Sequence, residues 1–157
     1  MKIFLLSATI FALSLCKSHA QTEAHKANEI VSFLEGKWHN YSFIISNNNP
    51  VTREDYKETM CIKNDSVLTI TAHNFKDGKD LTHDMILILK NDSIIMQQKS
   101  FIATGKREGN VYYLKGFAGG KEYRFRLYTM GDKYIFHNEV WANGKIEMMN
   151  MSYLIRE

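Results

Sequence analysis

The feature that most constrains this chain is a series of residue pairs that favour tight turns. Asparagine, aspartate and glycine tolerate the positive φ angles that two-residue hairpin turns require. The segments between the pairs are roughly 8–12 residues long, which suits strands better than helices. A chain divided in this way is expected to fold as consecutive antiparallel hairpins. The pairs are Asn64-Asp65, Asp77-Gly78, Asn91-Asp92, Gly119-Gly120, Gly131-Asp132 and Asn143-Gly144.

Consecutive hairpins leave two unpaired sheet edges, and closing the sheet on itself removes both of them. We therefore predict an all-β fold, an up-and-down meander barrel of about 8–10 antiparallel strands, in preference to a two-sheet sandwich. The barrel should occupy residues 36–157 as a single domain. The strands are expected near Trp38–Ile45, Tyr56–Lys63, Ser66–Phe75, Leu81–Lys90, Ser93–Ala103, Asn110–Phe117, Lys121–Met130, Lys133–Ala142 and Lys145–Arg156.

Residues 1–20 are typical of a secretory signal peptide. Lys2 gives a charged start, residues 3–15 are apolar, and small Ser18 and Ala20 stand before the polar residues that follow. The apolar stretch is too short for a permanent membrane-spanning helix. We therefore expect an exported protein, periplasmic or extracellular, with no transmembrane segment after cleavage. A minor alternative is lipid attachment at Cys16, because residues 13–16 partly match a lipobox.

Cleavage would change the composition in two ways. The segment 1–20 carries two lysines and no acidic residue, so the formal net charge would fall from +3 to +1. No dense basic patch remains, and nucleic acid is excluded as a partner. Cys61 would be left as the one thiol, so no internal disulfide can form. Its place in an alternating apolar run predicts a packed side chain.

Residues 21–35 are predicted to contain one short N-terminal helix. The apolar residues in this segment recur at helical spacing, and Thr22 and Glu23 suit a helix N-terminus. No second helical pattern follows. The residues that set the spacing are Ala24, Ala27, Ile30, Val31 and Leu34.

The last two hairpins predict two faces of the sheet. A two-residue turn at Gly131-Asp132 pairs Leu127 with Phe136, Arg126 with His137 and Arg124 with Glu139. A similar turn at Asn143-Gly144 pairs Trp141 with Ile146, Glu139 with Met148, His137 with Asn150, and Phe136 with Met151. One face is then apolar, and it should point inward because burying its rings removes the most apolar area from water.

The inward face supplies the candidate ligand-binding residues. Its aromatic rings and flexible methionines would suit either a plain core or the lining of a ligand cavity. Asn138 stands out, because an amide on an apolar face needs a partner in the backbone or in a ligand. The candidates are Tyr123, Phe125, Leu127, Phe136, Asn138, Met149, Met151 and Tyr153.

The charged face has two interpretations. Arg124 opposite Glu139 is expected to be a cross-strand ion pair on the solvent side. Alternatively, Arg124, Arg126, His137 and Glu139 could line a polar interior and bind a carboxylate or carry out acid–base chemistry. An exposed apolar patch around Trp141 would instead favour a non-catalytic envelope interaction module.

Metal and catalytic motifs are absent from the sequence. The histidines show no zinc-binding spacing, and there is no nucleophile elbow, phosphate loop or paired-carboxylate motif. We therefore predict no metal, no cofactor and no catalytic residue, and favour a binding protein over an enzyme. The predicted partner is a small hydrophobic or amphipathic molecule, and no feature sets an oligomeric state.

The ends of the meander resemble the calycin pattern. Gly36-Lys37-Trp38 precedes the first predicted strand and Arg156 closes the last. In lipocalins and their relatives, a Gly-X-Trp begins the first strand, and an arginine of the final strand packs across the tryptophan. The segment from Asn143 to Tyr153 is also similar to the end of a family of bacterial lipocalin-like proteins. The resemblance implies a lipocalin-like barrel, structural roles for Trp38 and Arg156, and, as in some calycins, haem binding through one histidine, here His137 or His83.

Overall fold

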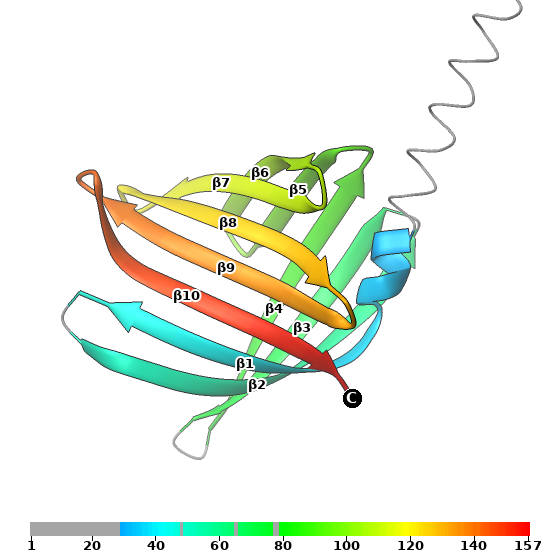
Figure 1. The fold of residues 1–157 in the computed structure, drawn as a ribbon, viewed down its shortest axis with the longest axis horizontal. Helices are drawn as coiled ribbons and strands as arrows, with labels where there is room; N and C mark the ends of the chain where they lie inside the picture. Colours follow the sequence, from blue (N-terminus) through cyan, green and yellow to red (C-terminus); the bar gives the residue numbers. More distant parts are fainter. Residues whose placement is uncertain (1–28, 48, 65, 77–78) are drawn as a thin grey trace, which may run out of the picture.

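The computed structural model of the chain describes residues 29–47, 49–64, 66–76 and 79–157. The predicted signal peptide over residues 1–20, the alternative lipid attachment at Cys16 and the first part of the predicted helical segment lie outside the described residues. Figure 1 shows the described part as a barrel of long strands with a short helix at one end.

Ten strands follow one another along the chain with tight connections between them. Asn143 and Gly144 both have positive φ angles, 52° and 73°, as a two-residue hairpin turn of this residue type requires. The strands are β1 (Gly36–Ser46), β2 (Asn49–Asn64), β3 (Val67–Lys76), β4 (Lys79–Lys90), β5 (Ser93–Gln98), β6 (Phe101–Glu108), β7 (Val111–Ala118), β8 (Lys121–Met130), β9 (Lys133–Ala142) and β10 (Lys145–Arg156).

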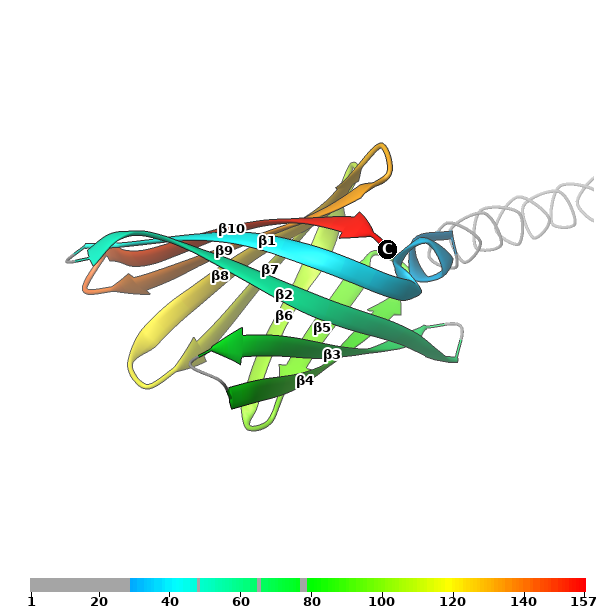
Figure 2. The same cartoon turned by 90° about the horizontal axis from the view of Figure 1, so that it is seen from below.

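The strands form a closed antiparallel barrel in which each strand pairs with its neighbours in sequence and β10 pairs with β1. Figures 1 and 2 show β10 beside β1, where the barrel closes. Closure leaves no unpaired sheet edge. The predicted all-β meander barrel with one short helix is confirmed.

The segment Ser93–Ala103 was expected to be one strand, and this prediction is wrong. The structure divides it into β5 and β6 by a tight turn at Lys99 and Ser100. Lys99 adopts a positive φ of 49°, a conformation that is uncommon for residues other than glycine and asparagine. No glycine, asparagine or aspartate therefore marks the connection in the sequence.

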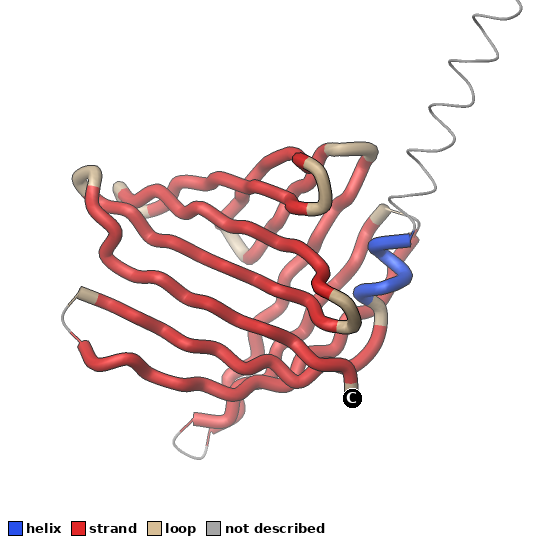
Figure 3. Tube along the Cα trace, in the orientation of Figure 1, coloured by secondary structure: helices blue, strands red, loops and turns tan. Residues whose placement is uncertain are grey.

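The helix, residues 29–34, closes one end of the barrel. In Figure 3 it lies beside the C-terminal end of the last strand. Val31 and Leu34 are buried in the apolar core, and the indole Nε1 of buried Trp38 donates a hydrogen bond of 2.8 Å to the carbonyl oxygen of Leu34. The side chains that fill this end of the barrel come from all around the sheet and include Leu68, Leu87, Leu89, Ile94, Tyr112, Leu114, Leu127 and Leu154.

Arg156 seals the same end from the last strand. Its guanidinium carbon lies 4.6 Å from the centre of the Trp38 ring, as the resemblance to calycins implies. The guanidinium also donates hydrogen bonds to the carbonyl oxygens of Glu35, at 2.7 Å, and Phe33. Gly36 makes room for it, because a Cβ at this position would lie 2.8 Å from Nη1 of Arg156. The chain therefore enters β1 through a glycine directly beneath the arginine.

A β-bulge in β10 changes which residues of that strand point inward. Ile146 pairs with Trp141 as expected, but the register shifts before Met148, which pairs with Val140 and not with Glu139. The extra residue, Glu147, has no register partner on β9. Since a shift of one residue reverses the faces of a strand, the predicted pairings beyond Ile146 are wrong.

Candidate ligand-binding cavity

The barrel encloses a cavity of about 450 Å³ between its filled end and the loops at the opposite end. That volume lies within the range of small-molecule sites. Gln98, Phe101 and Ala118 line it beside the β5–β6 and β7–β8 turns, and exposed His83 on β4 also belongs to the lining. The cavity therefore reaches solvent at the end opposite the helix.

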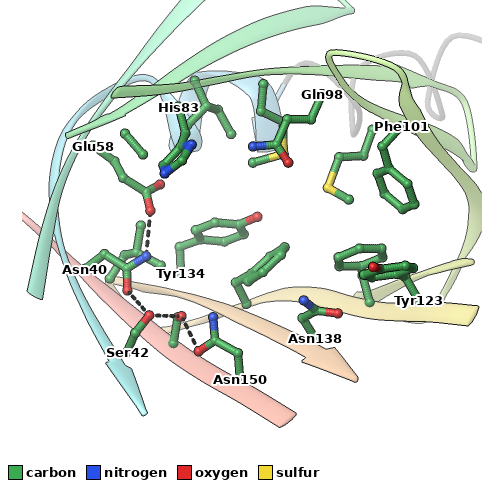
Figure 4. Close-up of a pocket in the computed structure, with 18 of the residues that line it drawn as sticks. Asn40, Ser42, Glu58, His83, Gln98, Phe101, Tyr123, Tyr134, Asn138 and Asn150 are labelled. Atoms are coloured by element: carbon green, nitrogen blue, oxygen red, sulfur yellow. Dashed lines mark hydrogen bonds between the residues drawn. The ribbon is translucent and has the colours of Figure 1, made fainter. Parts of the chain in front are cut away.

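One wall of the cavity is apolar and aromatic. Phe101 packs edge-on against Tyr123 with ring centres 5.1 Å apart, and Phe125 lies 5.7 Å from Phe136. Figure 4 shows Phe101 and Tyr123 at one side of the cavity. Such a surface offers shape and dispersion contacts to an apolar body. The other apolar lining residues are Ile70, Ala72, Met85, Met96, Ala118, Tyr134 and Leu154.

A row of polar side chains crosses β2, β1, β10 and β9 on the inner surface (Figure 4). Asn40 Nδ2 donates a 2.5 Å hydrogen bond to Glu58 Oε1, and Ser42 Oγ lies 3.3 Å from Asn40 Oδ1. Ser42 Oγ and Ser152 Oγ are 2.6 Å apart, and Ser152 Oγ lies 3.3 Å from Asn150 Oδ1. We call this set, completed by Asn138 opposite Asn150, the inner polar row.

Glu58 is the acidic member of the inner polar row. Burial raises the pKa of its carboxyl group, and the hydrogen bond from Asn40 opposes that shift. Its accessible part faces the cavity, which it lines beside Tyr134. Burial, followed by the charge of Glu58, also raises the pKa of the Tyr134 hydroxyl. The acid is therefore held in a site that disfavours its charged form.

The structure brings Tyr123, Phe125, Phe136 and Asn138 together in the lining of the cavity. Their contact with a ligand stays a prediction. Asn138 is notable because its buried Oδ1 has no hydrogen-bond partner. Leu127 points inward too, but it belongs to the core at the filled end.

The inward orientation predicted for Met149, Met151 and Tyr153 is wrong. The bulge at Glu147 turns all three to the outer surface, where Met151 is 52% exposed and Tyr153 stacks on Tyr41 with ring centres 5.1 Å apart. Asn150 and Ser152 take the inner positions instead. The bulge thus exchanges two methionines for an amide and a hydroxyl in the lining.

The cluster of Arg124, Arg126, His137 and Glu139 lies on the outer face, since these residues alternate with the cavity-lining side chains of β8 and β9. The predicted register of this hairpin is confirmed. Glu139 is buried and pairs with Arg126 at 3.2 Å, not with Arg124. The alternative that placed this cluster inside the barrel is therefore wrong.

The surroundings of the cluster are those of a packed outer surface. The guanidinium of Arg124 covers Trp141 at 4.1 Å, and Trp141 Nε1 donates a 2.9 Å hydrogen bond to Glu139. The pKa of His137 is lowered by burial and then by Arg126, with Glu139 opposing the shift. Of the two histidines considered for haem, His137 is on this outer face and His83 lines the cavity.

Cys61 is exposed, so the prediction that it is packed in the interior is wrong. Its neighbour Met60 is buried in the core, and successive residues of a strand point to opposite faces. The apolar run around Cys61 therefore has its inward positions at Met60 and, by alternation, Ile62.

Sequence reasoning missed Glu58, Asn40, Ser42, Asn150 and Ser152 as cavity residues. One signal was available for two of them. Trp38 is an inward residue, so strict alternation along β1 places Asn40 and Ser42 on the same face. No comparable marker existed for Asn150 and Ser152, because the bulge that turns them inward has no glycine.

Within the part of the chain that the structure describes, no group of three or more His, Cys, Asp or Glu side chains is arranged to hold a metal ion. The same residues contain no helix with the length and apolar character needed to cross a membrane.

No protein-family model and no curated protein sequence matches this chain. Solved structures do match. The S-type phycobiliprotein lyase CPES from Guillardia theta aligns with a TM-score of 0.68 and 9% identity over 88% of this chain and 97% of that one. Rv2717c from M. tuberculosis aligns with a TM-score of 0.59 and 17% identity over 83% of this chain and 97% of that one.

Identities this low establish the fold alone. The closed ten-stranded barrel and the similarity to these two solved structures fit a lipocalin-like fold. The chain is thus a lipocalin-like barrel with an internal cavity.

Proposed function

We propose that this protein is an exported binding protein that holds one small amphipathic molecule inside its barrel. The observation that carries the proposal is the two-sided lining of the cavity. An aromatic wall faces an inner polar row in which the buried Oδ1 of Asn138 lacks a partner. A buried carbonyl without a donor costs about 1–3 kcal/mol, and a ligand donor would remove that cost.

A binding role is favoured over catalysis by where the titratable groups lie. The one cluster that sequence reasoning offered for acid–base chemistry is on the outer face, in a packed network with Trp141. The cavity itself offers one acid, Glu58, and one histidine, His83, on different strands.

The proposal is tested by filling the cavity mouth. Ala118 lines the cavity, whereas the adjacent Phe117 is 69% exposed on the outer face. Ala118→Trp should weaken the binding of an environment-sensitive apolar dye by about tenfold or more, with Phe117→Trp as the matched control. Equal dye affinity in both variants, or no dye binding to the native protein, would contradict an interior site.

Export is the second part of the proposal, and it is supported by the charged start, apolar stretch and small residues of segment 1–20. The test is the mass of the protein recovered from its native host. Cleavage after Ala20 should leave Gln21 as the first residue. A mass that retains residues 1–20 would contradict export by this route, and a lipid-modified mass starting at Cys16 would select the lipidated form.

A further inference from the structure

The charges that line the cavity restrict the chemistry of its ligand. Among the described residues of the lining there is no lysine or arginine, and Glu58 is the one acid. His83 is the one residue there that could carry positive charge, and it is exposed at the mouth. A carboxylate headgroup would therefore meet no lysine or arginine among the described residues that line the cavity.

The hydrogen count of the inner polar row points in the same direction. Ser42 and Ser152 make three contacts, with each other and with the amide oxygens of Asn40 and Asn150. Two hydroxyl groups have two hydrogens to donate. One of the three contacts therefore lacks a serine hydrogen, and Oδ1 of Asn138 has no hydrogen-bond partner.

Glu58 is the strongest acceptor in the row. Asn40 donates to its Oε1, and the groups near it from other strands are Ala72 on adjacent β3, His83 on β4 and Tyr134 on β9. Figure 4 shows His83 and Tyr134 on either side of the Glu58 carboxyl group. Among the described residues, no ion pair gives the carboxylate a cationic partner, and a buried carboxylate is costly without one.

We propose that the ligand is an amphiphilic amine, whose apolar body lies on the aromatic wall and whose protonated nitrogen binds Glu58. This inference rests on the proposed function and names its ligand class. An ammonium group is a donor with a positive charge, so it satisfies both the carboxylate and the acceptors of the row.

The same arrangement predicts proton release on binding. Burial raises the pKa of Glu58 in the empty cavity, and an ammonium group beside the carboxyl would lower it. At pH values between the pKa of the carboxyl group in the empty cavity and its pKa beside the amine, binding therefore releases the carboxyl proton to solvent. Affinity for the amine should rise with pH through the pKa of Glu58, until the amine itself loses its proton.

The experiment compares three probes with the same alkyl chain, dodecylamine, dodecanol and laurate, by displacement of the apolar dye. We expect the amine to bind at least about tenfold more tightly than the other two. Glu58→Gln should abolish that preference, and Glu108→Gln, which changes an exposed glutamate on β6, should retain it.

Calorimetry gives a second readout that needs no variant. Dodecylamine binding to the native protein is measured in buffers of different ionisation enthalpy, and proton release on binding is expected. Laurate or dodecanol binding as tightly as the amine, an amine preference that survives in Glu58→Gln, or no proton release would each overturn the inference while leaving interior binding intact. Failure of all three probes to displace the dye would overturn the inference, and absence of dye binding would overturn the proposed function as well.

Discussion

Trp38 and Arg156 are register partners on β1 and β10, and the guanidinium carbon of Arg156 lies 4.6 Å from the centre of the Trp38 ring. The same guanidinium donates to the carbonyl oxygens of Phe33, in the last turn of the helix, and of Glu35, directly after it. One side chain thus joins the last strand, the first strand and the helix.

Arg156→Ala should lower the free energy of unfolding by about 2–3 kcal/mol, because it removes a cation–π contact and hydrogen bonds to two carbonyls. Arg156→Lys should recover little, since an ammonium lacks the planar fork. Urea unfolding measures both. Arg53→Ala is the control, because Arg53 lies on exposed β2 surface and pairs with Asp55. Equal effects at positions 53 and 156 would refute the proposed role.

The raised pKa of Glu58 predicts a pH dependence of stability. An acid whose pKa is higher in the folded state than its unfolded value near 4.5 holds its proton longer when folded. The folded state then binds more protons, so stability falls as pH rises through the folded pKa. Relative to Glu58→Gln, the native protein should lose unfolding free energy as pH rises above about 4.5, until the carboxyl group of the folded state is ionised as well.

This dependence is measured by urea unfolding of both proteins across that range. A difference in unfolding free energy that stays constant with pH would show that burial does not shift the pKa of the Glu58 carboxyl group. A native protein that gains stability relative to Glu58→Gln as pH rises would show that its pKa is lowered instead.

Replacement of Asn138 by leucine tests whether its side-chain amide stabilises the fold. The buried Oδ1 of Asn138 has no partner, so Asn138→Leu should leave the unfolding free energy unchanged or raise it by up to about 1 kcal/mol. Asn40→Leu should instead cost about 2 kcal/mol, because it breaks contacts to Glu58 and Ser42. Thermal melts of the two variants provide the comparison. Equal losses would mean that Asn138 has a structural partner.

The bulge at Glu147 predicts which thiols of β10 react with a maleimide. In a background with Cys16→Ser and Cys61→Ser, which removes both native thiols, Met151→Cys should be labelled at the rate of a free thiol. Ser152→Cys should react at least about tenfold more slowly, because it is reached mainly through the cavity or by local opening. The opposite order would indicate the unbulged register.

The turn chemistry made most of this fold predictable. Gly131-Asp132 set the register of β8 and β9 correctly, because a two-residue turn leaves only one pairing. The prediction from turn residues is wrong where the backbone turns or bulges without such residues. Lys99 adopts a positive φ without being glycine or asparagine, and the bulge at Glu147 adds a residue inside a strand.

The aromatic wall of the candidate cavity was predictable from the sequence, and the inner polar row was not. The aromatic residues of β8 and β9 alternate cleanly with charged ones, so their inward face is visible in the sequence. Glu58 lies in β2 among exposed polar residues, with no apolar alternation to mark the inward side. Its environment comes from Asn40 on the adjacent strand β1 and from Tyr134, which closure of the barrel brings near it from β9.

The meander also places the mouth of the cavity and the contacts that stabilise the fold at opposite ends of the barrel. The β5–β6 and β7–β8 turns lie at the cavity mouth, while the helix, Trp38 and Arg156 lie at the filled end. Substitutions in the mouth loops therefore act far from the contacts that hold the fold. A chain organised in this way can change what it admits, by evolution or by engineering, and stay folded while it does so.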